Sequence, residues 1–182
     1  MGRGTKTYGF LSDPVVRTTF YTELNAMLQG WEYQVVARVI KKGEYLARYA
    51  ATAVDPYLDS LDILVERFCL ELGYDLDAGF ICAEKRNPSL DRELMQAWEE
   101  LRTVGTSYAK SESIDSRVIG LDLRDKKPNL AGLQLADLVI TPIGRHVAGK
   151  TPKAAQVQWS VVERKLWRVN GTYEGKGLVI RP

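Results

Sequence analysis

The chain has few of the residues that build common metal and redox sites. Its 182 residues include one histidine, His146, and two cysteines, Cys69 and Cys82. A single histidine excludes a centre built from several histidines, and its place beside Arg145 at a helix end predicts a partner for the helix dipole. Both cysteines lie in apolar segments, so no redox or zinc motif is present. We predict a reduced, cytoplasmic setting.

The sequence also has no long apolar run, no apolar core of a signal peptide and no large excess of one charge. No run approaches the roughly 18 apolar residues of a membrane helix, and residues 1–6 contain no apolar signal core. We therefore expect no contact with a membrane. The 25 basic and 23 acidic residues leave a formal net charge of +2, so any attraction to nucleic acid must come from local patches. No glycine-rich phosphate loop is present either.

The composition is that of one globular domain. With 45% apolar and 26% charged residues, a chain of 182 residues can bury a sizeable core. We expect residues 1–12 to be a disordered or loosely attached start. Residues 13–150 are predicted to form an α/β core domain, and residues 151–182 a C-terminal extension that packs on it.

Capping signals and apolar stripes at helical spacing predict four main helices. Each of the first three begins with Asp or Asn followed by proline in the first helical position, and each ends at a glycine. In the fourth helix, Pro142 is expected to cause a kink or an interruption. The predicted helices cover residues 13–30, 55–73, 87–105 and about 130–147, with a short helical piece at 45–49.

Three segments rich in β-branched, aromatic or continuous apolar residues predict strands. They cover residues 31–40, 80–84 and 117–123, and residues 177–180 predict one further short strand. Because helices separate these strands, we expect parallel crossovers and an α/β sheet flanked by helices. So small a sheet leaves an edge uncovered, which predicts a homo-oligomer or a strand supplied by a partner.

Two acidic residues stand alone in apolar surroundings. Glu84 is the only charge in residues 79–84, and Asp137 is the only charge in residues 130–140. A carboxylate at the edge of a buried strand, or inside an apolar helix, costs several kcal/mol unless it is paired or bound to metal. We predict that both residues belong to a functional site.

Glu84 and Asp137 are the candidate catalytic and metal-binding residues. A two-metal phosphodiesterase needs several carboxylates around two cations about 4 Å apart, and hard oxygen ligands suit Mg²⁺ or Mn²⁺. Both residues are expected at the carboxyl edge of the sheet. Asp91 is a third candidate ligand, although an acidic residue in the first turn of a helix also stabilises the helix dipole.

Other polar residues are candidates for supporting roles. Gln134 lies one turn before Asp137 and is placed to orient it, and Arg86 and Glu66 are further supporting candidates. Three cations are candidates for contact with a nucleic-acid backbone. They are Lys126, Lys127 and Arg145.

Structural alternatives stand beside these roles. Glu84 has Lys85 and Arg86 as possible ion-pair partners, and Asp137 is able to accept hydrogen bonds from loop amides. Glu66 fits a solvated or lysine-paired position on its helix. The basic residues fit a solvated surface equally well.

Short segments distributed along the chain carry a family resemblance. They are residues 11–14 (LSDP), 64–68 (LVERF), 83–86 (AEKR) followed by Asp91, 105–106 (GT), 132–138 (GLQLADL), and Lys165 with 175–178 (GKGL). From Leu11 to Pro182 the chain resembles the family called domain of unknown function 3800. The segment at 132–138 is the most specific part of this resemblance.

The resemblance implies a ribonuclease H-like fold with a mixed sheet flanked by helices. In that superfold, carboxylates from strands and helices gather around divalent metal ions. The resemblance thus implies a metal-dependent hydrolase of nucleic acid. Members of the family usually open with a strand that carries an Asp-Glu-Ser-Gly-type motif, which has no counterpart here. We therefore expect an N-terminally truncated domain with an incomplete acidic cluster, possessing either residual nuclease activity or none. The alternative is a non-catalytic binding or assembly module that uses an exposed sheet edge.

Overall fold

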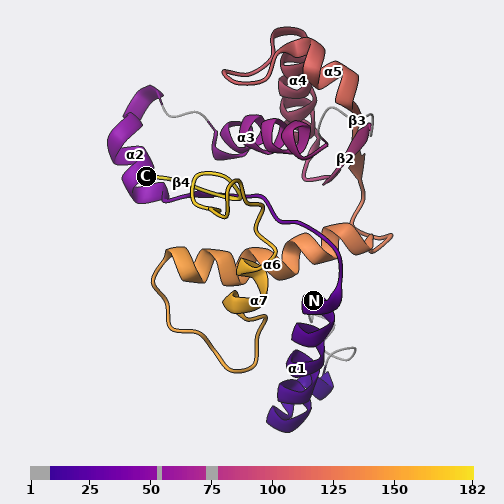
Figure 1. The fold of residues 1–182 in the computed structure, drawn as a ribbon, viewed down its shortest axis with the longest axis vertical. Helices are drawn as coiled ribbons and strands as arrows, with labels where there is room; N and C mark the ends of the chain where they lie inside the picture. Colours follow the sequence, from indigo (N-terminus) through magenta and orange to yellow (C-terminus); the bar gives the residue numbers. More distant parts are fainter. Residues whose placement is uncertain (1–8, 53–54, 73–77) are drawn as a thin grey trace.

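Helices and short parallel strands alternate in the computed structural model, which describes residues 9–52, 55–72 and 78–182. The fold is therefore α/β, as the sequence predicts (Figure 1). The helices are α1 (Pro14–Gly30), α2 (Lys42–Tyr49), α3 (Pro56–Glu71), α4 (Pro88–Val104), α5 (Ser111–Arg117), α6 (Ala131–Val147) and α7 (Trp159–Glu163). The strands are β1 (Ala37–Ile40), β2 (Gly79–Glu84), β3 (Val118–Arg124) and β4 (Leu178–Arg181).

The expected loosely attached start, residues 1–12, falls mainly on residues 1–8, which lie outside the described residues. The remainder, Gly9–Ser12, forms a short 3-10 helix without a buried residue.

The predicted capping residues start their helices. The Oδ1 atom of Asp13 accepts the Val15 N–H at 2.8 Å, and that of Asp55 accepts the Tyr57 N–H at 2.8 Å. Asn87 caps α4 in the same way. These contacts satisfy N–H groups that have no partner inside the helix, and the helix starts predicted from the sequence are confirmed.

Pro142 lies inside a continuous α6, so the interruption considered from the sequence is wrong. Both Pro142 and its neighbour Ile143 are buried. Burial of this apolar face compensates for the main-chain hydrogen bond that proline cannot make.

The strands form two separate parallel pairs, whereas we expected one sheet, which the family resemblance implied to be mixed. Strand β1 pairs with β4, with Ala37 opposite Leu178, and β2 pairs with β3, with Glu84 opposite Arg124. The predicted strand at 31–40 is shortened to its last four residues, because upstream only an isolated bridge links Val35 to Leu166. Antiparallel pairing in the described chain is limited to one isolated bridge.

The first hydrophobic core joins the two ends of the chain. It forms between α1, α6, α7 and the β1–β4 pair in the lower and middle parts of Figure 1. Residues 151–182 contribute more than half of the buried side chains of this core. The buried members are Leu28, Val35, Val139, Ile143, Val157, Val161, Val162, Leu166 and Leu178.

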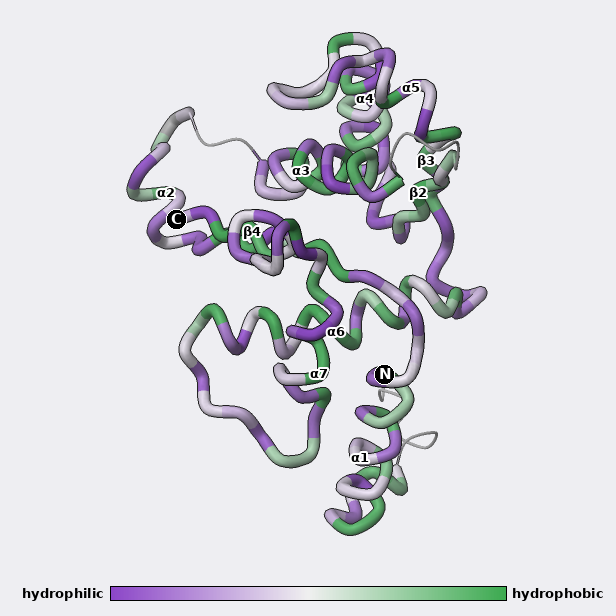
Figure 2. Tube along the Cα trace, in the orientation of Figure 1, coloured by the Kyte–Doolittle hydropathy of each residue, from purple (hydrophilic) through white to green (hydrophobic). Residues whose placement is uncertain are grey.

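The second hydrophobic core lies between α3, α4, α5 and the β2–β3 pair, at the top of Figure 1. Figure 2 shows green apolar residues recurring along α3 and α4, which lie beside β2 and β3. Trp98 of α4 is one of the largest fully buried side chains. The buried members are Leu61, Val65, Cys69, Leu94, Trp98, Leu101, Ile114 and Val118.

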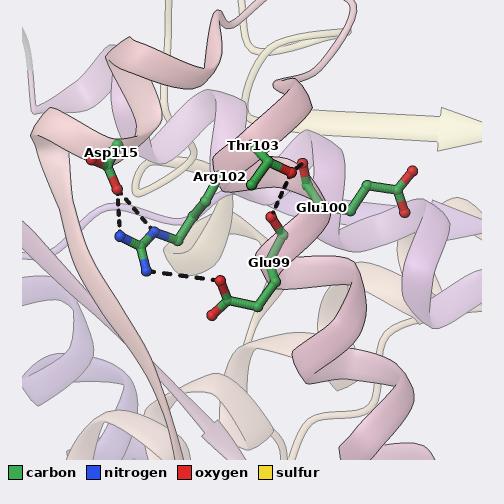
Figure 3. Close-up of polar contacts among 5 residues, drawn as sticks. All are labelled: Glu99, Glu100, Arg102, Thr103 and Asp115. Carbon is green, nitrogen blue, oxygen red and sulfur yellow. Dashed lines mark hydrogen bonds and ion pairs between the residues drawn. The ribbon is translucent and has the colours of Figure 1, made fainter.

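Ion pairs fasten α4 to α5 at the outer end of the second core (Figure 3). The Nε atom of Arg102 donates to Asp115 Oδ1 at 3.0 Å, and another guanidinium nitrogen lies 3.9 Å from Glu99. One arginine thus contacts two carboxylates and offsets one of their two negative charges. Both ion pairs are exposed, so each contributes at most about 1 kcal/mol.

The two cores meet through α3 and α6. Helix α3 contacts β1, and α6 contacts both β1 and β2. Within the described ranges, none of the helices combines the length and apolar character that crossing a lipid bilayer demands.

Candidate functional site

Charged residues gather where β2 and β3 end. Because the two strands are parallel, their carboxyl ends meet at one edge, and the Lys85 N–H donates to the Arg124 carbonyl at 2.9 Å. Glu84 Oε1 lies 3.3 Å from Lys126 Nζ, and Lys85 Nζ lies 3.3 Å from Asp125 Oδ2. The sequence-predicted acid Glu84 and cation Lys126 are therefore brought together at this edge.

Glu84 is less buried than the sequence indicated. Its side chain is 37% exposed, and its partner is Lys126 rather than the adjacent Lys85 or Arg86. An ion pair with this exposure contributes at most about 1 kcal/mol. The second oxygen of Glu84 has no partner among the described contacts, so the carboxylate retains a free acceptor.

Asp137 lies on the exposed side of α6, and the premise that it is buried is wrong. The buried side of the helix includes Val139 and Ile143. Asp137 precedes Val139 by two residues, which is about 200° around the helix. Gln134, one turn earlier, is exposed on the same side. Both belong to a helix that contacts β2, the strand of Glu84.

Asp91 closes the turn between β2 and α4. Its Oδ1 atom accepts the Arg86 backbone N–H at 2.9 Å, which ties the strand end to the first turn of the helix. The Arg86 guanidinium lies over the Tyr57 ring, 5.1 Å from its centroid. The described contacts thus give Asp91 a helix-start role, the alternative to metal binding.

Glu66 is buried, so its expected solvated or lysine-paired position is wrong. The residue is 3% exposed, and its Oε2 atom has no hydrogen-bond partner in the described structure. The nearest cation is the guanidinium of Arg67, at 4.0 Å. Both sides of α3 are covered, since the helix packs on the second core and also contacts β1, and this explains the burial.

Burial, together with acidic neighbours on α3, raises the pKa of Asp62. Desolvation is the main cause, followed by the nearby charges of Glu66 and Asp59. These positions follow one another at spacings of three and four residues, which places them on one side of the helix. That spacing was visible in the sequence but was not recognised as a site.

The remaining predicted residues are dispersed. Lys127 is exposed, and a guanidinium nitrogen of Arg145 donates to the Thr151 carbonyl in the turn after α6. His146 stacks on Trp159 with ring centroids 3.8 Å apart and an interplanar angle of 6°. The histidine is thus also a packing partner of α7, besides its place in the last turn of α6.

The carboxylate oxygens of Glu84 and Asp137 are suitable ligands for a hard cation such as Mg²⁺, but they do not form a complete ligand set. In the part of the chain that the structure describes, no group of three or more His, Cys, Asp or Glu side chains is arranged to hold a metal ion. Glu84 and Asp137 each retain free carboxylate oxygen, and Mg²⁺ is commonly held by one or two carboxylates together with water and substrate phosphate.

Comparisons with protein-family models, curated proteins and solved structures gave no match.

Proposed function

We propose that the protein is a divalent-metal-dependent nucleic-acid phosphodiesterase of ribonuclease H-like type, related to the family called domain of unknown function 3800. The observation that carries this proposal is the pairing of Glu84 with Lys126 at the carboxyl edge of two parallel strands. Open α/β sheets usually bind their ligands at that edge.

Glu84 and Asp137 are the residues that would hold Mg²⁺ or Mn²⁺. A bound ion supplies an activated water and stabilises the developing charge on the leaving oxygen. Lys126 lies beside Glu84 and would position a backbone phosphate without reading the bases. Gln134, one turn from Asp137, would hold the latter's carboxylate in place.

Cleavage of labelled single-stranded and duplex DNA and RNA tests the proposal. We expect cleavage with Mg²⁺ or Mn²⁺ that is lost in Glu84→Gln and in Asp137→Asn. Asp125→Asn is the matched control, because Asp125 is a 67% exposed acid at the same edge, paired with Lys85. Mn²⁺ should also raise the Tm of the native chain by mass action, but not that of Asp137→Asn. Absence of both cleavage and metal stabilisation would reject the proposal.

A second candidate function is assembly through the unpaired edge of β2, and a separate observation supports it. Within the described residues β2 pairs only with β3, and its exposed side chains include Phe80, which is 52% exposed. Phe80 also lines an apolar hollow of about 350 Å³ between β2 and α3. The occupant we propose is β2 of a second copy, since two equivalent edges can pair around a two-fold axis.

Size-exclusion chromatography with light scattering tests this assembly. We expect a dimer that Phe80→Lys converts to a monomer, because a charged edge resists strand addition. Ile140→Lys is the control, since Ile140 is an apolar residue of α6, not of β2, and is 66% exposed. A native monomer at micromolar concentration would exclude the dimer.

A further inference from the structure

A basic hollow lies where β1, α3 and the end of β2 converge. It measures about 360 Å³, and it is lined by Arg38 of β1, Lys42 of α2 and Arg86 after β2. Tyr57 and Ser60 of α3 supply further polar groups. Three cations from three parts of the chain therefore face one space, although the whole chain carries a formal net charge of only +2.

The charges of the hollow do not cancel. Asp55 is the one acidic residue in its lining, and its carboxylate already accepts the Tyr57 N–H as the cap of α3. The side chains of Lys42 and Arg86 form no ion pair within the described ranges, although the Arg86 backbone N–H donates to Asp91. Arg38 is paired with Asp59, which lies outside the lining, so Lys42 and Arg86 face the single carboxylate of Asp55. This leaves a local excess of positive charge, which favours an anion.

Arg38 is held in place before any ligand binds. Its side chain is 6% exposed, and its Nη2 atom lies 2.6 Å from Asp59 Oδ2. The other oxygen of Asp59 lies 2.7 Å from a guanidinium nitrogen of Arg181. One carboxylate thus fixes two guanidinium groups, and this cluster keeps one net positive charge.

We propose that this hollow binds the terminal phosphate group of a nucleotide or of a nucleic-acid strand. Guanidinium and ammonium groups are the usual side-chain donors to phosphate oxygens, and Arg86 is oriented by its packing over the Tyr57 ring. The volume lies within the range of small-molecule sites, so it exceeds what a lone phosphate fills. The site uses neither Glu84 nor Asp137, so it does not depend on the proposed hydrolysis.

Calorimetric titration of the full chain tests the site with defined probes. The probes are inorganic phosphate, adenosine 5′-monophosphate, adenosine, and a tetranucleotide with or without a 5′-phosphate. We expect saturable binding only of probes that carry a terminal phosphate. Tighter binding of the mononucleotide identifies a free nucleotide as the ligand, whereas tighter binding of the phosphorylated tetranucleotide identifies a strand end.

Variants of exposed residues locate the binding without threatening the fold. Arg86→Gln and Lys42→Gln should each weaken binding about tenfold, the loss expected when one charged hydrogen bond is removed. Lys41→Gln is the matched control, because it removes the same charge one residue away, outside the hollow, and should change binding less than twofold. Asp137→Asn should bind normally, which separates this site from the proposed catalysis. Equal losses in all three cation variants, or no saturable binding of any phosphorylated probe, would overturn the proposal.

Discussion

Arg38 of β1 and Asp59 of α3 form an ion pair of 2.6 Å whose side chains are only 6% and 10% exposed. Arg181 of β4 reaches the second oxygen of the same carboxylate at 2.7 Å. Because α3 belongs to the second core and both strands to the first, this single acid connects the two halves of the molecule.

Asp59→Asn should therefore destabilise the protein strongly. The substitution leaves the guanidinium groups of Arg38 and Arg181 without their counter-charge, and removing one partner of a buried pair costs about 3–5 kcal/mol. Urea unfolding followed by circular dichroism measures the loss. Glu44→Gln breaks the exposed Lys41–Glu44 pair and should cost less than about 1 kcal/mol. Equal losses in the two variants would show that burial of the Asp59 pairs is not what makes them important.

Asp62→Asn should raise the Tm at pH 7. Desolvation and neighbouring acids raise the pKa of Asp62 above its ordinary 3.8, so its ionisation destabilises the folded state. This cost is absent below about pH 3.8, where the unfolded chain is protonated as well, and it develops as the pH rises. The gain in Tm over the native chain should accordingly shrink as the pH falls from 7 toward 3. A gain that stays constant with pH, or a lower Tm at pH 7, would contradict the raised pKa.

Gly177→Ala should lower the free energy of unfolding, and Gly144→Ala should raise it. A Cβ atom on Gly177 would lie 2.3 Å from the Trp167 carbonyl oxygen, a backbone contact that cannot move aside. We expect a loss of about 2 kcal/mol. Gly144 lies inside α6 with open space around it, so alanine there should stabilise the helix by up to about 1 kcal/mol. Thermal unfolding of the two variants compares them directly, and a stabilising Gly177→Ala would show that the backbone yields.

Lys126→Gln should strengthen Mn²⁺ binding if Glu84 is a metal ligand. Lys126 competes with the metal for Glu84, and an exposed pair of this kind is worth up to about 1 kcal/mol, or roughly fivefold in affinity. Lys127→Gln removes the same charge without breaking that pair and should have a smaller effect. Calorimetric Mn²⁺ titration gives both affinities. An unchanged affinity in Lys126→Gln would separate Glu84 from metal binding.

Local signals in the sequence were sufficient to place most helices and strands. Asp13, Asp55 and Asn87 start their helices because cap side chains act on N–H groups two or three residues away. Strand β2 was recognisable from its short apolar run, which ends at Glu84. Such features depend on neighbours in the sequence and need no knowledge of the fold.

The division of the sheet and the burial of the acids depend on distant partners. Glu66 is buried because α3 is covered by β1 as well as by its own core, and Asp137 is exposed because α6 turns Val139 inward. The pairing of Arg38 with Asp59 is likewise set by how β1 packs on α3. No local pattern encodes these contacts. The sequence therefore indicated which acidic residues to consider, but not whether each one is buried or exposed.

The arrangement of the two cores bears on how the chain folds as it leaves the ribosome. Every buried residue of the second core lies between Leu61 and Val118. This core can therefore form before the C-terminal third has been synthesised. The first core needs Leu28 and Leu178 together, and therefore waits for nearly the whole chain. During translation, the early half would serve as a folded platform while α1 and β1 await their C-terminal partners.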